Sequence, residues 1–127
     1  MSNRTVAQKL FIKEGHRVLF VGAPEGYQDL LGPLPSQVTL LKELQAPIDV
    51  IQVFVASREE LEVQLPTLKQ ALAPKGMLWV AYHKGSSKVK TDINRDSIAA
   101  YARSIGLEAV AIISVDDDWS ALRLKLA

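Results

Sequence analysis

The sequence predicts a three-layer α/β protein, Rossmann-like, with a mostly parallel sheet. Two nearly all-apolar runs, 48–57 and 77–82, flank a segment with the periodicity of an amphipathic helix. Runs without polar alternation are typical of parallel strands that helices cover on both faces, so these segments predict a βαβ unit. The chain ends in two further runs of β type, which predict an antiparallel hairpin at the sheet edge. We expect about six strands, in the order 2-1-3-4-6-5 when numbered along the chain.

The composition is that of one globular domain, residues 1–127, with apolar residues at 48% and charged residues at 23%. The 15 basic and 14 acidic residues leave a net charge of +1, which gives no field to attract nucleic acid or an anionic membrane. Cysteine is absent, the first residues lack the pattern of a signal peptide, and no apolar run approaches the roughly 18 residues of a membrane span. We therefore expect a cytoplasmic protein without nucleic-acid or membrane partners.

Cap and turn residues divide the chain into successive elements. In order, these are a helix capped by Asn3 or Thr5, a strand at 17–21, a helical turn at 27–31, a strand at 38–41, a strand at 48–57, a helix opened by a Ser57–Glu60 capping box, a strand at 77–82, a helix capped by Thr91 or Asp92, and strands at 108–115 and 120–126. The buried sides of the helices are expected to carry Val6, Leu10 and Phe11, then Leu61, Leu65, Leu68 and Leu72, and finally Ile98, Ala102 and Ile105.

Two places in this pattern leave alternatives open. Residues 42–47 alone separate two strands, and about six residues reach little more than 20 Å, whereas a helical crossover needs a dozen residues or more. The 38–41 strand is therefore either very short and followed by an extended crossover, which we favour, or an antiparallel edge. Pro66 lacks a backbone donor, so we expect either a kink or a restarted helix there.

Three segments, 10–26, 68–82 and 106–127, resemble the Rossmann-like methyltransferases that use S-adenosylmethionine. The whole chain also resembles a family of small bacterial proteins catalogued only as a domain of unknown function. The first resemblance implies a Rossmann-like fold, and S-adenosylmethionine is the cofactor of that family. The second resemblance implies a fold and no activity.

The methyltransferase motifs are only partly present. In that family an acidic residue precedes a GxGxG loop by two places, and a carboxylate at the end of strand two holds the ribose hydroxyls. Here Phe20 takes the acidic place, Lys42 stands nearest to the carboxylate position, and Glu43 would face the other side of the strand. The loop consists of Gly22, Ala23, Pro24, Glu25 and Gly26. Pro24 has no N–H and fills space through which a ligand would approach, so we expect no cofactor.

The carboxyl ends of parallel strands form the rim at which an open α/β sheet binds ligands. At this rim the sequence places the 22–26 turn, Ser57, Arg58, His83 and Lys84. An anionic or nucleotide-like ligand would use backbone N–H groups at the end of the turn, with Arg58 and Lys84 as charge partners. In the alternative interpretation the glycines only shape a tight turn and the charges are solvated.

No spacing typical of a metal or catalytic centre occurs in the sequence. His16 and His83 flank different strands, and neither a Ser-His-Asp set nor a GxSxG elbow can be assembled. The lysine-rich segment 84–90 lacks the spacing of a phosphate loop and is expected to be a solvated loop or a mobile lid. Asp116–Asp118 is expected to form a polar hairpin turn and no calcium site.

These observations predict a non-catalytic or vestigial Rossmann-like module. We expect it to bind or assemble through an exposed sheet edge, either with a second copy of itself or with another protein. The alternative is a minimal enzyme that binds S-adenosylmethionine or a nucleotide at the rim of the sheet.

Overall fold

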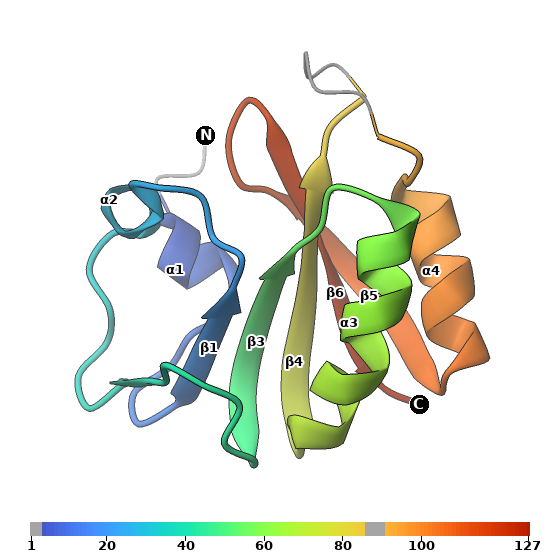
Figure 1. Ribbon diagram of the computed structural model, residues 1–127. Coiled ribbons are helices and arrows are strands. Elements are labelled where there is room, and N and C mark those ends of the chain that lie inside the picture. The colour runs from blue at the N-terminus through green and yellow to red at the C-terminus, as the bar shows by residue number, and fades with distance from the viewer. Residues whose placement is uncertain (1–3, 86–90) are drawn as a thin grey trace.

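The computed structural model describes residues 4–85 and 91–127 as a six-stranded sheet with two helices on each face (Figure 1). The helices are α1 (Val6–Lys9), α2 (Tyr27–Leu31), α3 (Arg58–Ala71) and α4 (Arg95–Ser104). The strands are β1 (Arg17–Val21), β2 (Thr39–Leu40), β3 (Ile48–Phe54), β4 (Leu72–His83), β5 (Leu107–Ser114) and β6 (Trp119–Leu126). Their order, β2-β1-β3-β4-β6-β5, confirms the predicted order. Strand β6 is antiparallel to both of its neighbours, β4 and β5, and the remaining pairs are parallel.

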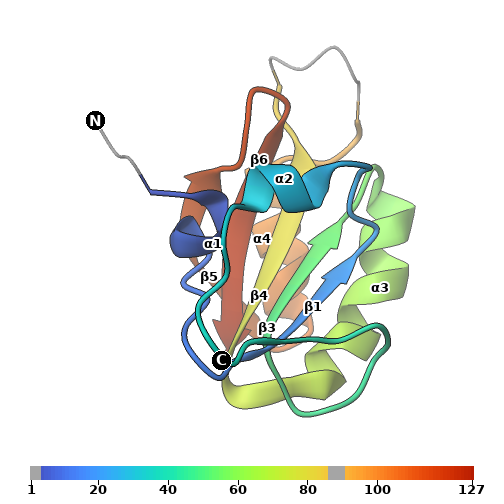
Figure 2. The ribbon, with the colours of Figure 1, turned by 90° about the vertical axis from the view of Figure 1, so that its left-hand side faces the viewer.

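The two faces of the sheet have separate cores. The leucines of α3 and the inner residues of α4 pack on one face, and α1 and α2 cover the other (Figure 2). On the α1 side Trp79 is completely buried, and its indole N–H donates to the carbonyl of Leu10 at 3.1 Å. In the described ranges no helix is long and apolar enough to cross a membrane.

The central strand β3 explains the missing polar alternation in its sequence. Strands β1 and β4 flank it and helices cover both faces, so its side chains lose contact with water. Val50, Ile51 and Val53 have no exposed surface, and neither does the amide side chain of Gln52. This buried glutamine lies on the face covered by α1 and α2, where it contributes to the site described below.

The link between β2 and β3 takes the extended path that we favoured. β2 runs parallel to β1 and pairs only with its first two residues, Arg17 and Val18. The Arg17 guanidinium then holds the link by donating to the carbonyls of Gln45 and Pro47 at 2.7 and 2.8 Å. The charged guanidinium thus gives hydrogen bonds to two main-chain carbonyls that lie outside the helices and strands.

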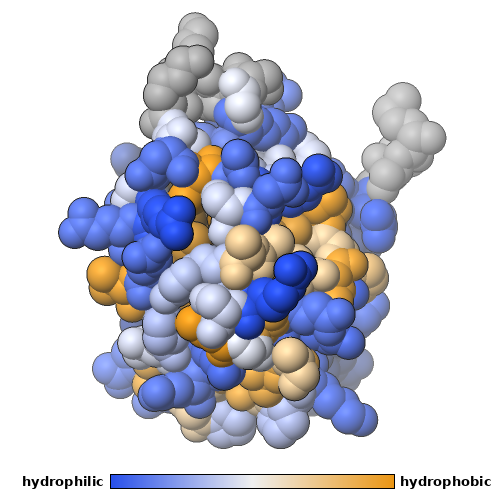
Figure 3. All heavy atoms as spheres, turned by 90° about the vertical axis from the view of Figure 1, so that its right-hand side faces the viewer, coloured by the Kyte–Doolittle hydropathy of each residue, from blue (hydrophilic) through white to orange (hydrophobic). Residues whose placement is uncertain are grey.

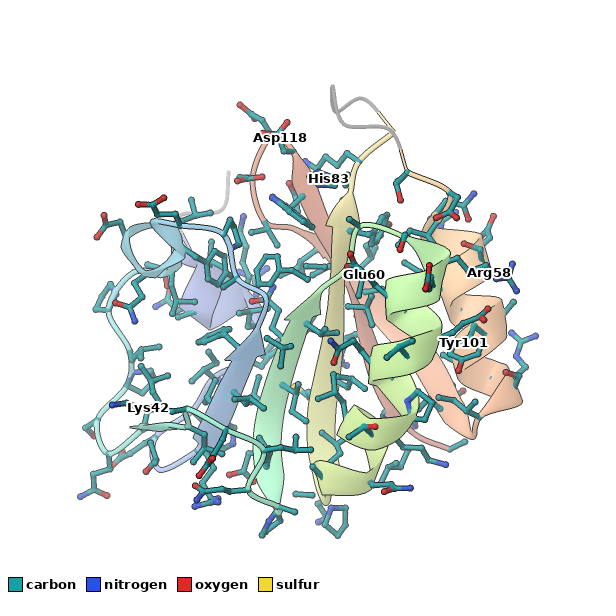
Figure 4. All side chains as sticks on the ribbon, viewed as in Figure 1. Lys42, Arg58, Glu60, His83, Tyr101 and Asp118 are labelled. Carbon is teal, nitrogen blue, oxygen red and sulfur yellow. The ribbon has the colours of Figure 1, made fainter. Side chains whose placement is uncertain are left out.

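Pro66 lies inside one continuous helix, so the predicted restart is wrong. Proline cannot donate to the carbonyl four residues earlier, which belongs to Glu62. The Tyr101 hydroxyl of α4 donates to that carbonyl at 3.2 Å and replaces the missing bond (Figure 4). The contact joins α3 to α4 at the point where the proline weakens α3.

Several predicted boundaries are also wrong. Asn94 caps α4, because Thr91 and Asp92 instead bind the β3–α3 corner, with the Thr91 hydroxyl donating to the Ala56 carbonyl at 2.7 Å. Phe11 is not buried, since α1 ends at Lys9 and the backbone of Phe11 has a φ of 59°.

The strand after α3 begins at Leu72, five residues earlier than expected. Leu72 pairs with Ile48, and the next pair along the ladder is Val50 with Met77, so residues 73–76 form an irregularity in the strand. At the other end of the sheet, the polar turn of the hairpin is confirmed. The Asp116 carboxylate accepts the N–H groups of Asp118 and Trp119, both at 2.8 Å.

Replacing Arg17 with methionine should lower the free energy of unfolding by about 1–2 kcal/mol, because two main-chain carbonyls lose a charged donor. Urea denaturation measures this change. The matched control is Lys75→Met, an exposed cation after α3, which should change stability by less than about 0.5 kcal/mol. Equal effects of the two substitutions would show that Arg17 does not hold the link.

Tyr101→Phe should destabilise the protein by about 0.5–1 kcal/mol in the natural background. In a Pro66→Ala background the same substitution should cost much less, since the new N–H at position 66 can donate to the Glu62 carbonyl. A double-mutant cycle from denaturation curves measures the difference. An equal cost in both backgrounds would contradict this explanation of how α3 tolerates its proline.

Candidate functional site

The carboxyl ends of β1, β3 and β4 lie along one edge of the sheet, at the top of Figure 1. The predicted rim residues fall there in three groups with different surroundings. The turn of Gly22, Ala23, Pro24, Glu25 and Gly26 connects β1 to α2, Ser57 and Arg58 begin α3, and His83 and Lys84 end β4. That these residues bind a ligand stays a prediction.

The turn after β1 is shaped by its two outer glycines. Gly22 has a φ of +72°, and a Cβ there would lie 3.3 Å from the Phe54 carbonyl oxygen. Gly26 has a φ of +80° and precedes α2, whose first N–H, from Tyr27, donates to the Pro24 carbonyl at 3.1 Å. Both conformations favour glycine, so the turn keeps its form although proline occupies its centre.

A cavity of about 680 Å³ lies beside this turn. Its apolar walls come from Phe20, Pro24, Leu31, Leu34 and Leu40. Tyr27, Gln28 and Asp29 are the lining residues with polar side-chain atoms. Of the predicted site residues, Ala23, Pro24 and Gly26 line it. No lysine, arginine, histidine or serine of the described ranges does so.

The backbone edge of β1 is open next to this cavity. The carbonyls of His16 and Val18 accept N–H groups of Thr39 and Leu41, at 2.9 and 2.8 Å. Successive peptide groups of a strand point to opposite edges, so the main-chain N–H and C=O of Phe20 point to the same side. Pairing with β2 has already ended there. The Phe20 peptide groups therefore offer a donor and an acceptor beside an apolar wall.

A row of aromatic rings crosses the sheet below the rim. The rings of Phe20, Tyr27, Phe54, Trp119 and His83 follow one another, with centroid separations of 5.6, 4.9, 5.1 and 3.9 Å. The first three contacts are edge-to-face, an arrangement that aromatic pairs favour. The row joins the 22–26 turn region to the end of β4 through packing alone.

The Tyr27 hydroxyl lies below the turn and donates to Gln52 at 2.5 Å. Burial raises the pKa of this hydroxyl far above its ordinary value, and the hydrogen bond opposes the rise only in part. The phenol therefore stays neutral at physiological pH and is unsuited to act as a base. In the described part of the chain the Gln52 amide nitrogen has no hydrogen-bond partner.

Ser57 and Arg58 belong to the structure of α3. The Ser57 hydroxyl accepts the Glu60 N–H at 3.2 Å, and the Glu60 carboxylate accepts the N–H of Ala56 at 2.9 Å instead of that of Ser57. Arg58 points away from the rim and donates from Nε to Glu62 at 2.7 Å (Figure 4). Its backbone N–H donates to Asp92 at 2.8 Å.

His83 and Lys84 fasten the end of β4 to the β5–β6 hairpin. Lys84 donates from Nζ to the Ser114 hydroxyl at 2.7 Å and from its backbone to the Asp118 carbonyl at 2.8 Å. The His83 ring stacks on Trp119, and its buried Nδ1 has no partner among residues 4–85 and 91–127. Lys84 is thus engaged by the hairpin. The lid predicted for the lysine-rich segment falls on residues 86–90, which lie outside the described ranges.

Sequence reasoning missed the Tyr27–Gln52 pair and the aromatic row. One signal was present, because Gln52 is the polar residue in the middle of an apolar run. The equivalent of the ribose carboxylate, Lys42, is exposed and lies far from the rim where His83 and Glu60 are found (Figure 4).

Neither the known protein-family models nor the curated protein sequences match this chain. Solved structures match it closely in fold. A TehB-like SAM-dependent methyltransferase from Corynebacterium glutamicum is 13% identical with a TM-score of 0.64, over 99% of this chain and 89% of that protein. A SAM-dependent methyltransferase from Aquifex aeolicus is 15% identical with a TM-score of 0.66, over 96% and 88%.

Fibrillarin from Aeropyrum pernix, solved with natively bound S-adenosyl-L-methionine, is 16% identical with a TM-score of 0.62, over 94% of this chain and 72% of that protein. Identities this low establish the fold alone. The chain has the Rossmann-like α/β fold of S-adenosylmethionine-dependent methyltransferases.

Proposed function

We propose that this protein is a cytoplasmic, non-catalytic module that binds a neutral small molecule beside the 22–26 turn and assembles through a sheet edge. The observation that carries the proposal is the chemistry of the cavity. Among the described residues that line it, the walls are apolar, the one charged side chain is the carboxylate of Asp29, and no basic group occurs. The two cations predicted to hold an anion, Arg58 and Lys84, are bonded to Glu62 and Ser114.

These residues do not fit S-adenosylmethionine. The cofactor carries a carboxylate besides its ammonium and sulfonium groups, and the carboxylate calls for charged or clustered backbone donors. In the turn, Pro24 supplies no N–H and the N–H of Tyr27 is already bonded to the Pro24 carbonyl. The cation at the end of β2, Lys42, is not among the residues that line the cavity. We therefore derive no methyl-transfer step.

The cavity suits a flat, uncharged ligand. Phe20, Leu31, Leu34 and Leu40 provide apolar contact, and a planar amide or neutral heteroaromatic ring could bond to both peptide groups of Phe20. A volume of about 680 Å³ lies in the usual range for small-molecule sites. The buried, neutral Tyr27 hydroxyl is unsuited to act as a base, and the Asp29 carboxylate has no histidine, lysine or serine beside it among the described lining residues. Within residues 4–85 and 91–127 no three acidic or histidine side chains cluster as metal ligands would.

The alternative is a minimal enzyme that binds S-adenosylmethionine or a nucleotide. One observation favours it, because the cavity adjoins the loop between β1 and α2 in a fold shared with methyltransferases, one of them solved with bound S-adenosyl-L-methionine. The two functions differ in the ligands that they predict.

Calorimetric titration separates the two functions. S-adenosylmethionine, its demethylated product, ATP and NAD should each bind with a dissociation constant in the millimolar range or weaker. Phe20 and Lys42 stand where the resemblance to methyltransferases places the carboxylates for an adenosyl ligand, and the described lining residues include no cation for the phosphates of ATP and NAD. Micromolar binding of any of them, abolished by Ala23→Trp at the cavity wall or by Arg58→Ala, would establish the alternative.

A neutral fluorescent probe, N-phenyl-1-naphthylamine, tests the binding proposal itself. The probe should bind to the protein, and Leu40→Asp should weaken its binding about fivefold or more, since an apolar wall becomes charged. Leu44→Asp is the matched control, because Leu44 and Leu40 are 43% and 42% exposed but Leu40 alone lines the cavity. Equal loss in both variants, or no binding at all, would contradict the proposed site.

A further inference from the structure

The outer edge strand β5 is unusually open to pairing with another strand. It has eight residues, and neither proline nor lysine occurs among them. Natural sheets commonly use such residues to keep edges apart. The one charged side chain of β5, Glu108, lies 3.7 Å from Lys125 of the neighbouring strand β6. Val110 and Ile112 are 38% and 44% exposed. Figure 3 views the molecule from this side and shows apolar surface between the polar side chains.

The hydrogen bonds with β6 determine which peptide groups of β5 face outward. At one end the Val115 N–H donates to the Trp119 carbonyl at 2.9 Å, and at the other end the Ala127 N–H donates to the Gly106 carbonyl at 3.0 Å. Antiparallel pairs alternate between bonded and non-bonded types, and the ladder shifts register at Val110. Counting inward from both ends leaves four residues whose peptide groups point away from β6, namely Leu107, Ala109, Ile112 and Ser114.

These four residues are symmetric about the bond between Val110 and Ala111. In an evenly alternating strand the centre of such an antiparallel pair would fall on a residue, whereas the bulge at Val110 moves the centre to the bond between Val110 and Ala111. A second β5 in antiparallel orientation would place Leu107 opposite Ser114 and Ala109 opposite Ile112, and each of these pairs would exchange two hydrogen bonds. The bulge, which would disturb pairing with a regular strand, meets an identical bulge at the symmetry axis.

We propose that two copies of this chain associate through β5 about a two-fold axis between Val110 and Ala111, which joins their sheets into one. The proposal specifies the sheet edge of the assembly function given above and depends on that function. Large and small side chains then alternate across the interface, because the exposed Ile112 lies beside Ala109 of the second copy. Both side chains lie on the α4 face, where they border the same shallow depression.

Helix α4 supplies complementary charges at the same interface. Arg95 and Asp96 line one depression with Ile112 and without Ala109, and Arg103 lines another with Ala109. The two-fold axis therefore places Asp96 of one copy level with Arg103 of the other, on both sides of the axis. The Asp96 side chain is 88% exposed. Among the ion pairs of the described residues, its partner is Arg95, at 3.6 Å. Asp96 is thus free to approach a second cation.

One existing contact must change on association. Lys9 donates from Nζ to the Ser114 carbonyl at 3.2 Å and covers one end of the free edge. This half-buried lysine can move aside at small cost, since its ammonium regains water. Association through the other edge is disfavoured, because β2 has only two residues.

Sedimentation velocity of the full chain tests the proposal over about 1–200 μM. The mass should rise toward twice 14.0 kDa. Ile112→Lys should weaken association about a hundredfold, because a charge enters the strand edge. Val63→Lys should have no effect, since Val63 is 68% exposed on α3, away from the edge. Far-UV circular dichroism of Ile112→Lys checks that its fold is kept.

A charge exchange tests the orientation of the two copies. Asp96→Arg should weaken association about tenfold, and Asp96→Arg combined with Arg103→Asp should restore it. If a dimer forms that neither Ile112→Lys nor the charge exchange affects, the β5 interface is wrong and assembly through another surface stands. A monomer at every concentration contradicts both the interface and the assembly function. Ligand binding is measured separately and is unaffected by either result.

Discussion

The short link between β2 and β3 constrains most of what is distinctive in this molecule. Residues 41–47 must return from the carboxyl end of β2 to the amino end of β3 and pass β1 on the way. Seven residues span at most about 25 Å, and crossing two strand spacings already uses about 10 Å. If β2 were longer, the same seven residues would also have to run back along its additional length. β2 therefore stops after two residues, and Arg17 holds the link that returns beneath β1.

The site follows from that shortened strand. Because β2 ends low on β1, the peptide groups of Phe20 have no neighbouring strand, and a cavity with apolar walls lies beside them. The charged groups of the rim serve the fold, since Arg58 and Lys84 are bonded to Glu62 and Ser114. Tyr27 and Phe54 support the turn from below through edge-to-face contacts. The turn keeps glycines at positive φ on both sides of its central proline, and the proposed ligand of the cavity beside it is neutral.

The sequence predicts the parts of the structure that depend on local pattern. The apolar runs of β3 and β4, the leucine stripe of α3 as far as Leu68 and the terminal hairpin are confirmed, as is the order of the strands. The errors arise where distant contacts decide the outcome. Thr91 and Asp92 are good cap residues, but the β3–α3 corner binds them and Asn94 caps α4 instead. Leu72 begins β4 because Ile48 is available to pair with it.

The position of the candidate site in the fold could be predicted from the sequence, but the hydrogen-bond partners of its charged side chains could not. The rule for parallel sheets places the 22–26 turn, α3 and the end of β4 on one rim, and they lie there. No local pattern shows that Lys84 bonds to Ser114, thirty residues away, or that Arg58 points toward Glu62. The bulge that sets the outward-facing residues of β5 is likewise a property of its register with β6 and cannot be seen in β5 alone.

The central claim is that the loop between β1 and α2 has kept its shape and lost the groups that hold an adenosyl cofactor. The most direct measurement is a crystal structure of the protein purified from cells without added ligand. We expect the cavity beside Ala23 and Pro24 to contain water or a neutral molecule bonded to the main chain of Phe20. An adenosyl group packed on Ala23 and Pro24, with its carboxylate bound by the chain, would contradict the claim.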